Sequence, residues 1–271
     1  MTIRVRAPAT TANLGPGFDC VAVALDLWNE LEVSEGENGA GPEHLGLHAF
    51  ARLAPLEGKR FVFTDRIPRE RGLGSSAAVI ALGLVAGALA AGREPDPEEL
   101  LAVGLDLEGH ADNLAAALQG GVCLTWEVRI ARIADRLPAV PLVLVPASTV
   151  STASARAALP EIVSHRDASF TAGRAVLLGA ALACGSPELF AAALADRLHE
   201  PYRGKTAPLL EEVRADVPEG ALGATISGSG PSVVVWAREE SADVCQQELE
   251  ERFPHARVLR LGVAASGAGP V

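Results

Sequence analysis

The sequence predicts an α+β fold made of two domains, and composition, chain length and secondary-structure patterns all support this. Apolar residues make up 49% and charged residues 21% of the chain, which is typical of a globular protein. In both halves, short β-branched runs that predict strands alternate with capped apolar segments that predict helices. A chain of 271 residues can bury a core in each of two small domains. We expect the boundary near residue 145, giving domains at 1–145 and 146–271.

The first half contains strand and helix signals separated by two expected loops. Small and turn-forming residues predict a loop at 7–17, and glycine, proline and acidic residues predict another at 34–43. Asp96 begins the clearest helix, because a capping residue is followed there by proline and, three positions on, by Glu99. We expect strands at 3–6, 21–33, 61–64, 122–128 and 142–145, and helices at 44–54, 75–91, 96–108 and 112–118.

The second half has its own mixture of helices and strands, which predicts a separate α+β unit. A glycine-rich loop at 227–231 lies between two β-branched runs. We expect helices at 167–184, 187–198, 206–215 and 239–252, and strands at 222–226, 232–237 and 256–263.

The charge of the chain argues against two classes of partner. A formal net charge of −11 repels nucleic acid and anionic membrane surfaces, so we expect neither as a partner. The uncharged stretch between Arg71 and Arg93 is rich in alanine and glycine and opens with serines, which favours a buried helix over a membrane span. The N-terminus lacks the apolar core of a signal peptide. Free thiols in a reducing cytoplasm are expected for the widely spaced Cys20, Cys123, Cys184 and Cys245.

The segment Pro68–Ala78, PRERGLGSSAA, is the strongest local signal for chemistry. A glycine-rich turn opens directly into an apolar helix, so the first free amides of that helix point toward the turn and favour a bound phosphate. Ser75 and Ser76 add hydroxyl groups at the same place. An ordinary glycine and serine helix start fits the same residues.

Two better-known phosphate motifs fit this segment poorly. Gly72, Gly74 and Ala77 match a dinucleotide fingerprint, but the strand and acidic residue expected about 20 residues later are replaced by the helix start at 94–97. A Walker motif also fails, because no Gly-Lys-Ser/Thr follows.

A second signal lies at the end of the helix that Asp96 begins. Leu101, Leu105 and Glu108 share one helix face, and a carboxylate on a leucine face is costly unless it is paired or binds a metal. Glu108 is therefore a candidate Mg²⁺ ligand, since Mg²⁺ prefers oxygen atoms. Glu108 pointing into solvent, with His110, Asp112 and Asn113 as turn and cap residues, is the alternative.

Two further loops combine small residues with polar side chains. The loop Ser227–Ser232, SGSGPS, is too rich in glycine for a minimal hairpin and favours close approach to a ligand or to the other domain. Near the N-terminus, Asn13 and Asp19 lie in or beside a loop of small residues, where they would face either a cleft or solvent.

In this order the motifs resemble the signatures of the GHMP kinases, the group of galacto-, homoserine, mevalonate and phosphomevalonate kinases. The resemblance rests on ANLGPGFD at 12–19, on Pro68–Ala78 and on Ser227–Ser232. Within the group, the homoserine kinases are the most similar branch. The features that favour this branch are the AxxxxANLGPGFD pattern at 7–19, LEG followed by HADN at 107–113, STASAR at 151–156 and PYR at 201–203.

The resemblance implies a fold and an activity. The fold would combine an N-terminal α/β domain of the ribosomal protein S5 domain 2-like type, with a left-handed βαβ crossover, and a C-terminal ferredoxin-like α+β domain. The activity would be ATP-dependent phosphorylation of the side-chain hydroxyl of L-homoserine, a step of threonine biosynthesis, with ATP and Mg²⁺ bound. A homodimer is compatible with the resemblance.

The resemblance also implies roles for particular residues. The triphosphate of ATP would be wrapped by Pro68, Arg69, Glu70, Arg71, Gly72, Leu73, Gly74, Ser75, Ser76, Ala77 and Ala78. Mg²⁺ would be held by Ser76, Glu108 and Thr152. L-homoserine would be bound by Asn13, Asp19, His110, Asn113, Arg156 and Arg203. The residues expected to act in catalysis are Asn113, Asp19 and His110.

Asn113 stands where some GHMP kinases have an aspartate, and an amide cannot accept a proton. We therefore expect catalysis mainly by positioning, with Asn113 orienting the hydroxyl of the substrate. Two other readings stay open: a GHMP kinase of the mevalonate type, and a catalytically silent GHMP-fold protein that only binds. The second should have lost the phosphate loop or the metal ligands, which are kept here as Gly72, Gly74, Ser75, Ser76 and Glu108.

Overall fold

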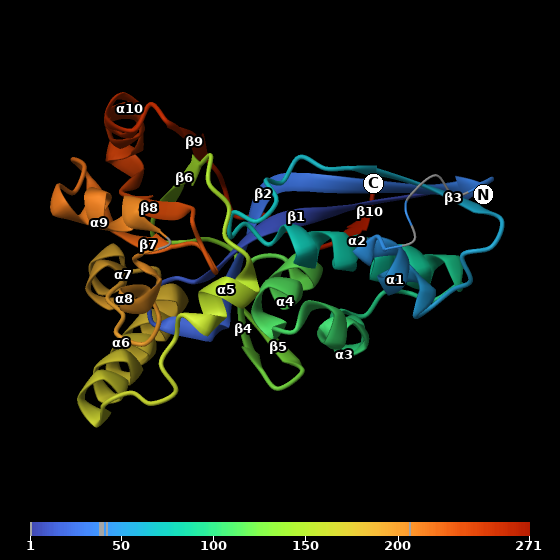
Figure 1. The fold of residues 1–271 in the computed structure, drawn as a ribbon, viewed down its shortest axis with the longest axis horizontal. Helices are drawn as coiled ribbons and strands as arrows, with labels where there is room; N and C mark the ends of the chain where they lie inside the picture. The colour runs from blue at the N-terminus through green and yellow to red at the C-terminus, as the bar shows by residue number, and fades with distance from the viewer. Residues whose placement is uncertain (1, 38–40, 42, 206) are drawn as a thin grey trace.

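The computed structural model describes residues 2–37, 41, 43–205 and 207–271, and their strands form two antiparallel sheets (Figure 1). In the first sheet the order is β10-β1-β2-β4-β5, and β3 also pairs with β2. The bounds of its strands are β1 Ile3–Asn13, β2 Gly17–Glu35, β3 Lys59–Thr64, β4 Val122–Trp126, β5 Arg129–Ala134 and β10 Gly269–Pro270.

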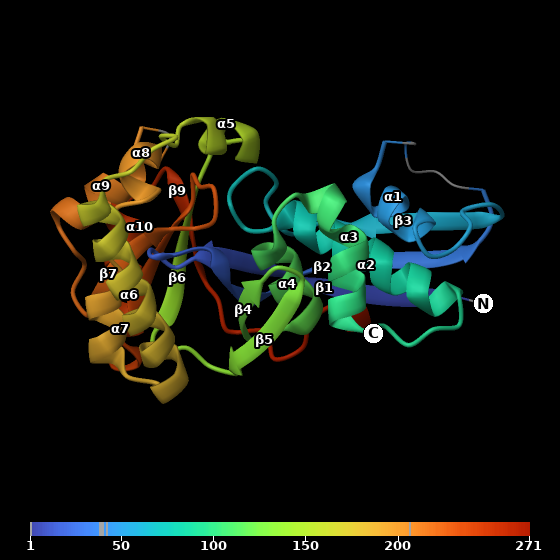
Figure 2. The same ribbon diagram turned by 90° about the horizontal axis from the view of Figure 1, so that it is seen from below.

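Four helices pack against one face of the first sheet, as Figure 2 shows from below. Their bounds are α1 Leu45–Ala51, α2 Ser75–Ala90, α3 Pro97–Glu108 and α4 Ala111–Gln119. α2 is buried along most of its length, and its small residues allow close packing. A Cβ at Gly83 would lie 2.2 Å from the carbonyl oxygen of Gly46, so α1 and α2 can approach this closely only with glycine there.

The second sheet has the strand order β7-β8-β6-β9 and helices on both faces. Val143, Val234 and Trp236 face one core, while Leu142 and Val233 on the same strands face the other, because neighbouring residues of a strand point to opposite sides. The strands are β6 Val140–Pro146, β7 Ala221–Ile226, β8 Val233–Ala237 and β9 Ala256–Arg260. The connectivity, with helices after β6 and α10 between β8 and β9, is the split βαβ arrangement of ferredoxin-like folds.

Helices pack against both faces of this sheet. α6 and α7 pack on the face of Trp236, and α9 and α10 on the face of Leu142. The bounds are α5 Thr152–Ala157, α6 His165–Cys184, α7 Pro187–Ala193, α8 Glu200–Arg203, α9 Pro208–Ala215, the 3₁₀ turn η1 Glu239–Ser241 and α10 Ala242–Arg252.

The end of the chain returns to the first sheet. β10 pairs with β1, Val263 bridges to Leu25, and the two ends of the chain lie near each other in Figure 1. The boundary expected after residue 145 falls inside β6, whose neighbours β8 and β9 both belong to the second sheet. The domain division remains a prediction, and this pairing favours a division ahead of Val140, with the C-terminal segment joined to the first domain.

Several expected elements differ from the observed ones. The loop expected at 7–17 is strand as far as Asn13, because Ala9 and the residues after it pair with β2. The helix expected at 187–198 ends at Ala193. β5, β10, α5 and α8 were not expected. Of the other expected elements, residues 38–40 and 42 of one loop and residue 206 of one helix lie outside the described residues.

In the described part of the chain, no helix is both long and apolar enough to cross a membrane, and the stretch between Arg71 and Arg93 forms the buried α2. Free thiols are found at Cys20, Cys123, Cys184 and Cys245.

Candidate active site

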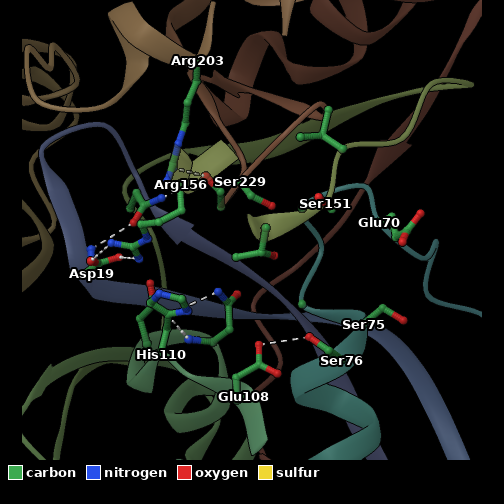
Figure 3. Close-up of a pocket in the computed structure, with 18 residues that line it drawn as sticks. Asp19, Glu70, Ser75, Ser76, Glu108, His110, Ser151, Arg156, Arg203 and Ser229 are labelled. Carbon is green, nitrogen blue, oxygen red and sulfur yellow. Dashed lines mark hydrogen bonds and ion pairs between the residues drawn. The ribbon is translucent and has the colours of Figure 1, made fainter. Parts of the chain in front are cut away.

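A pocket of about 230 Å³ lies where loops of the two halves meet (Figure 3). The elements around it are the end of β1, the start of β2, the start of α2, the ends of α3 and α4 that face each other, the segment leading into α5, α5 itself, α8 and the loop after β7. The predicted site residues that line it are Asn13, Asp19, Glu70, Gly72, Gly74, Ser75, Ser76, Glu108, His110, Asn113, Thr152, Arg156 and Arg203.

The N-terminus of α2 opens into this pocket. Gly74 begins the helix in a left-handed conformation, with φ of 62°, and no side chain of the described residues caps it. The first amides of α2 therefore remain available to an anion, and the first turn contains no acidic residue that would repel one. A Cβ at Gly74 would lie 1.8 Å from Oγ1 of Thr10, so this position tolerates only glycine.

Six residues of the predicted phosphate segment support it without lining the pocket. Arg71 donates to the carbonyl oxygens of Pro146 and Ala147 at 2.9 and 2.8 Å, and so joins the loop to the segment before α5. Arg69 pairs with Asp65 on the surface. The remaining members are Pro68, which is half-buried, and the buried Leu73, Ala77 and Ala78.

Glu108 and Ser76 form an oxygen-rich group beside the start of α2. The hydroxyl of Ser76 donates to Oε1 of Glu108 at 3.0 Å, and Figure 3 shows the two side chains pointing toward each other. Burial raises the pKa of Glu108 to about 7, and the nearby Asp112 adds to this rise. A carboxylate with a raised pKa at the edge of a polar pocket is a good candidate for binding a cation. Thr152, at the first turn of α5, lines the same pocket.

Asn113 is held in one orientation by its neighbours. Its Oδ1 accepts a hydrogen bond from Oγ1 of Thr10 at 2.6 Å, and its Nδ2 lies 3.3 Å from Oδ1 of Asp112. Asp112 is buried, which raises the pKa of its carboxyl group, and it also accepts from the backbone amide of Asn113. His110 precedes α4 and lines the pocket beside them. These contacts fix the orientation of the Asn113 side-chain amide, with Nδ2 as the hydrogen-bond donor.

Asp19 and Arg156 form a two-bond ion pair across the pocket, drawn in Figure 3. Both contacts measure 2.8 Å, and the fork geometry matches a guanidinium group to a carboxylate. Asp19 has φ of 59°, which places its side chain off the regular strand path. The pair joins the start of β2 to α5, two segments that are far apart in the sequence.

Asn13 and Arg203 meet at one backbone carbonyl. Nδ2 of Asn13 and Nη1 of Arg203 donate to the carbonyl oxygen of Gly228 at 3.0 and 2.9 Å. Oδ1 of Asn13 accepts from the amide of Asp19 at 3.1 Å, so the Asn13 side chain holds the start of β2, which carries Asp19. Both Asn13 and Arg203 are buried.

Sequence reasoning assigned no site role to five lining residues: Asp112, Val150, Ser151, Gly228 and Ser229. Gly228 and Ser229 belong to the loop whose glycine content predicted close approach to a ligand or domain. Its Ser227 hydroxyl donates to the carbonyl oxygen of Gly72 at 2.6 Å, so the loop contacts the phosphate segment directly. Asp112 was read only as a turn or cap residue, and nothing in the sequence marks Val150.

Comparison with known proteins shows the family to which the chain belongs. The family model described as GHMP kinases N terminal domain matches residues 44–121, and that described as GHMP kinases C terminal matches residues 177–255. A solved homoserine kinase from Cytophaga hutchinsonii aligns with a TM-score of 0.84 and 27% identity, over 100% of this chain and 97% of that one. The fold and the pocket define a small-molecule kinase of the GHMP class.

Relatives of known name narrow the family. The chain is 42% identical to the homoserine kinase of Streptomyces avermitilis over 98% of its own length and 94% of the relative. It is 40% identical to the homoserine kinase of Clavibacter michiganensis, over 91% and 86%. The chain therefore belongs to the homoserine kinase family of GHMP kinases, and the family resemblance and fold class predicted from the sequence are confirmed.

Proposed function

We propose that the chain transfers the γ-phosphoryl group of ATP to the side-chain hydroxyl of L-homoserine, forming O-phospho-L-homoserine for threonine biosynthesis. The oxygen of the hydroxyl group bonds to the γ-phosphorus, the bond from that phosphorus to the bridging oxygen breaks, and ADP and the hydroxyl proton leave. The observation that carries the proposal is one pocket that joins an uncapped helix N-terminus to the Asp19–Arg156 pair and Arg203.

The start of α2 would bind the phosphates of ATP. Its free amides provide donors, and the positive end of the helix dipole favours the negative charge that spreads over the phosphoryl oxygens during transfer. Ser75 and Ser76 add hydroxyl groups at this point. The surrounding glycines keep the loop backbone close to Ser227 and Thr10, which fixes the direction of these donors.

Ser76 and Glu108 would hold Mg²⁺, with Thr152 beside them. They fit because their donors are oxygen atoms only, and because a cation beside Glu108 would favour the charged form of a carboxylate whose pKa burial raises. When bound, Mg²⁺ supplies positive charge that offsets the charge of the phosphates.

Asn113 would orient the hydroxyl of the substrate. Thr10 occupies its carbonyl oxygen, so the amide offers an N–H to the pocket and cannot remove a proton. Transfer through a loose transition state depends mainly on alignment, for which a fixed donor is sufficient. His110, next to Asn113 in the pocket, would help to enclose the hydroxyl group.

Asp19, Arg156 and Arg203 would recognise the two charged groups of an α-amino acid. A carboxylate suits the guanidinium groups, and an ammonium group suits Asp19. Among the described residues, the buried Nε of Arg156 has no hydrogen-bond partner, which leaves a donor for a substrate carboxylate. Asn13 would act by holding the start of β2, which carries Asp19.

The direct test is ATP turnover with Mg²⁺ and one of L-homoserine, mevalonate, galactose or no acceptor, followed by phosphorus NMR of the product. Turnover with homoserine alone and a phosphate ester on its side-chain oxygen would support the proposal. Turnover with mevalonate would favour a GHMP kinase of the mevalonate type. Binding of ATP without turnover on any acceptor would favour a silent binding protein. We propose a cytoplasmic location, and sedimentation would test whether the protein forms a homodimer.

A further inference from the structure

A fully buried histidine lies behind the substrate side of the pocket. His199 has 0% exposed surface and immediately precedes α8, the short helix that carries Arg203. It does not line the pocket itself, yet it contacts Arg203, which does. Its environment determines which ring nitrogen carries the hydrogen.

The two ring nitrogens of His199 have opposite partners. Nε2 lies 2.7 Å from the carbonyl oxygen of Gly15, which can only accept, so Nε2 carries the hydrogen. Nδ1 lies 3.3 Å from Nη1 of Arg203, which can only donate, so Nδ1 is the acceptor. Burial lowers the pKa of His199, which agrees with a neutral ring. Both partners therefore require the same tautomer.

The face of the His199 ring supports an aromatic platform. Phe18 stacks on it with ring centroids 4.9 Å apart and an interplanar angle of 18°. The guanidinium carbons of Arg156 and Arg203 lie 5.1 and 5.2 Å from the centroid of Phe18. These distances allow cation–π attraction, so Phe18 holds both arginines that we assign to the carboxylate.

Arg203 is thus contacted from three directions: by Nδ1 of His199, by the carbonyl oxygen of Gly228 and by the ring of Phe18. His199 is itself fixed by Asp196, whose Oδ2 accepts from the backbone amide of His199 at 2.7 Å and from that of Glu200 at 2.9 Å. The planar guanidinium of Arg203 needs a defined orientation to meet a carboxylate with two parallel bonds.

We propose that His199 is a positioning residue that sets the affinity for the α-carboxylate of the substrate, through its Nδ1 contact with Arg203 and its stack on Phe18. This inference rests on the proposed function, because it takes the substrate to be an amino acid bound by Arg203. His199 acts on recognition of the acceptor and has no part in binding ATP, whose expected site is the segment Pro68–Ala78.

Two substitutions separate the two ring nitrogens. The terminal atoms of asparagine occupy nearly the position of Nδ1, and those of glutamine nearly the position of Nε2. His199→Gln keeps a donor for Gly15 and removes the acceptor for Arg203, so we expect the KM for L-homoserine to rise about tenfold, equal to about 1.4 kcal/mol. The kcat and the KM for ATP should stay within about twofold. His199→Asn keeps an acceptor for Arg203 and should raise this KM less.

Two further measurements guard against a purely structural effect. In an Arg203→Lys background, His199→Gln should add little to the KM for homoserine, because the two residues act as a unit. In the unmodified protein, nitrogen NMR of the His199 ring should show the Nε2–H tautomer, and its Nδ1 signal should shift when homoserine binds. This second measurement needs no variant to fold.

The outcomes are distinct. Three results would each overturn the role of His199 and leave the proposed function intact. They are an unchanged KM for homoserine in His199→Gln, additive effects of His199→Gln and Arg203→Lys on that KM, and an Nδ1 signal that does not shift when homoserine binds. Equal losses toward ATP and homoserine would also overturn it, because they indicate general damage. Failure of the unmodified protein to turn over homoserine would overturn the proposed function, and this inference with it.

Discussion

Glu108→Gln is expected to stabilise the metal-free protein at high pH while removing its activity. Burial raises the pKa of Glu108 from 4.5 to about 7, with Asp112 adding to the rise and the hydrogen bond from Ser76 opposing it. The folded protein therefore holds this proton more tightly than the unfolded chain does. The contribution of Glu108 to stability is fully present below about pH 4.5 and is lost as the pH rises through about 7.

The size of the effect follows from that change in pKa. A rise from 4.5 to about 7 corresponds to about 3 kcal/mol at about 1.4 kcal/mol per pH unit. Because Glu108 is only half-buried and water screens its charge, we expect Glu108→Gln to raise the free energy of unfolding by about 1–2 kcal/mol at about pH 8. Near pH 4 both proteins carry a neutral group, and the difference should vanish.

Urea unfolding in the presence of a chelator, at several pH values, measures this difference. Glu98→Gln is a matched control on the same helix, because hydrogen bonds from Ile130 and Arg129 lower the pKa of Glu98. Glu98→Gln should have the opposite effect and lower the free energy of unfolding, relative to the unmodified protein, at pH values above about 4.5. Turnover with Mg-ATP should fall more than about a hundredfold in Glu108→Gln. A stability difference that does not change with pH would refute the assignment of a half-buried carboxylate that holds its proton.

Three further changes test other parts of the structure. Thr10→Val removes the hydroxyl that fixes Asn113, so kcat should fall about tenfold or more in steady-state assays with the KM for ATP unchanged, and Thr10→Ser should recover most of it. Gly83→Ala places a methyl group against the Gly46 carbonyl and should lower the free energy of unfolding by about 1–3 kcal/mol in urea. Arg156→Lys cannot form both 2.8 Å bonds to a carboxylate, so the KM for homoserine should rise at least about tenfold, and an unchanged KM would contradict its role.

The local chemistry of the chain made much of the fold predictable. Capping residues such as Asp96 located helix starts, and the glycine and serine run at 72–76 located the start of α2 beside the pocket, because both signals act over a few residues. The strand at 7–13 was missed for a different reason. Alanine, proline and asparagine are depleted in strands, and pairing with β2 overrides their weak strand preference.

The contacts that orient the site side chains could not be predicted from the sequence, because they join residues that are distant in the chain. Thr10 and Asn113 are 103 residues apart, and Gly15 and His199 are 184 apart. The helix expected at 187–198 ends at Ala193, and Asp196 instead binds the amides at the start of α8. No periodicity in the sequence indicates that the side chain of Asp196 will accept hydrogen bonds from the backbone at the start of α8.

The most direct test of the account is the choice of acceptor among L-homoserine, 4-hydroxybutyrate and 3-aminopropan-1-ol. The latter two keep the reacting hydroxyl and lack, respectively, the ammonium and the carboxylate group. We predict that kcat/KM for ADP release falls by about a hundredfold or more with each analogue, because Asp19 or the arginine pair then loses its partner. Equal kcat/KM for all three acceptors would contradict recognition of an amino acid by this pocket.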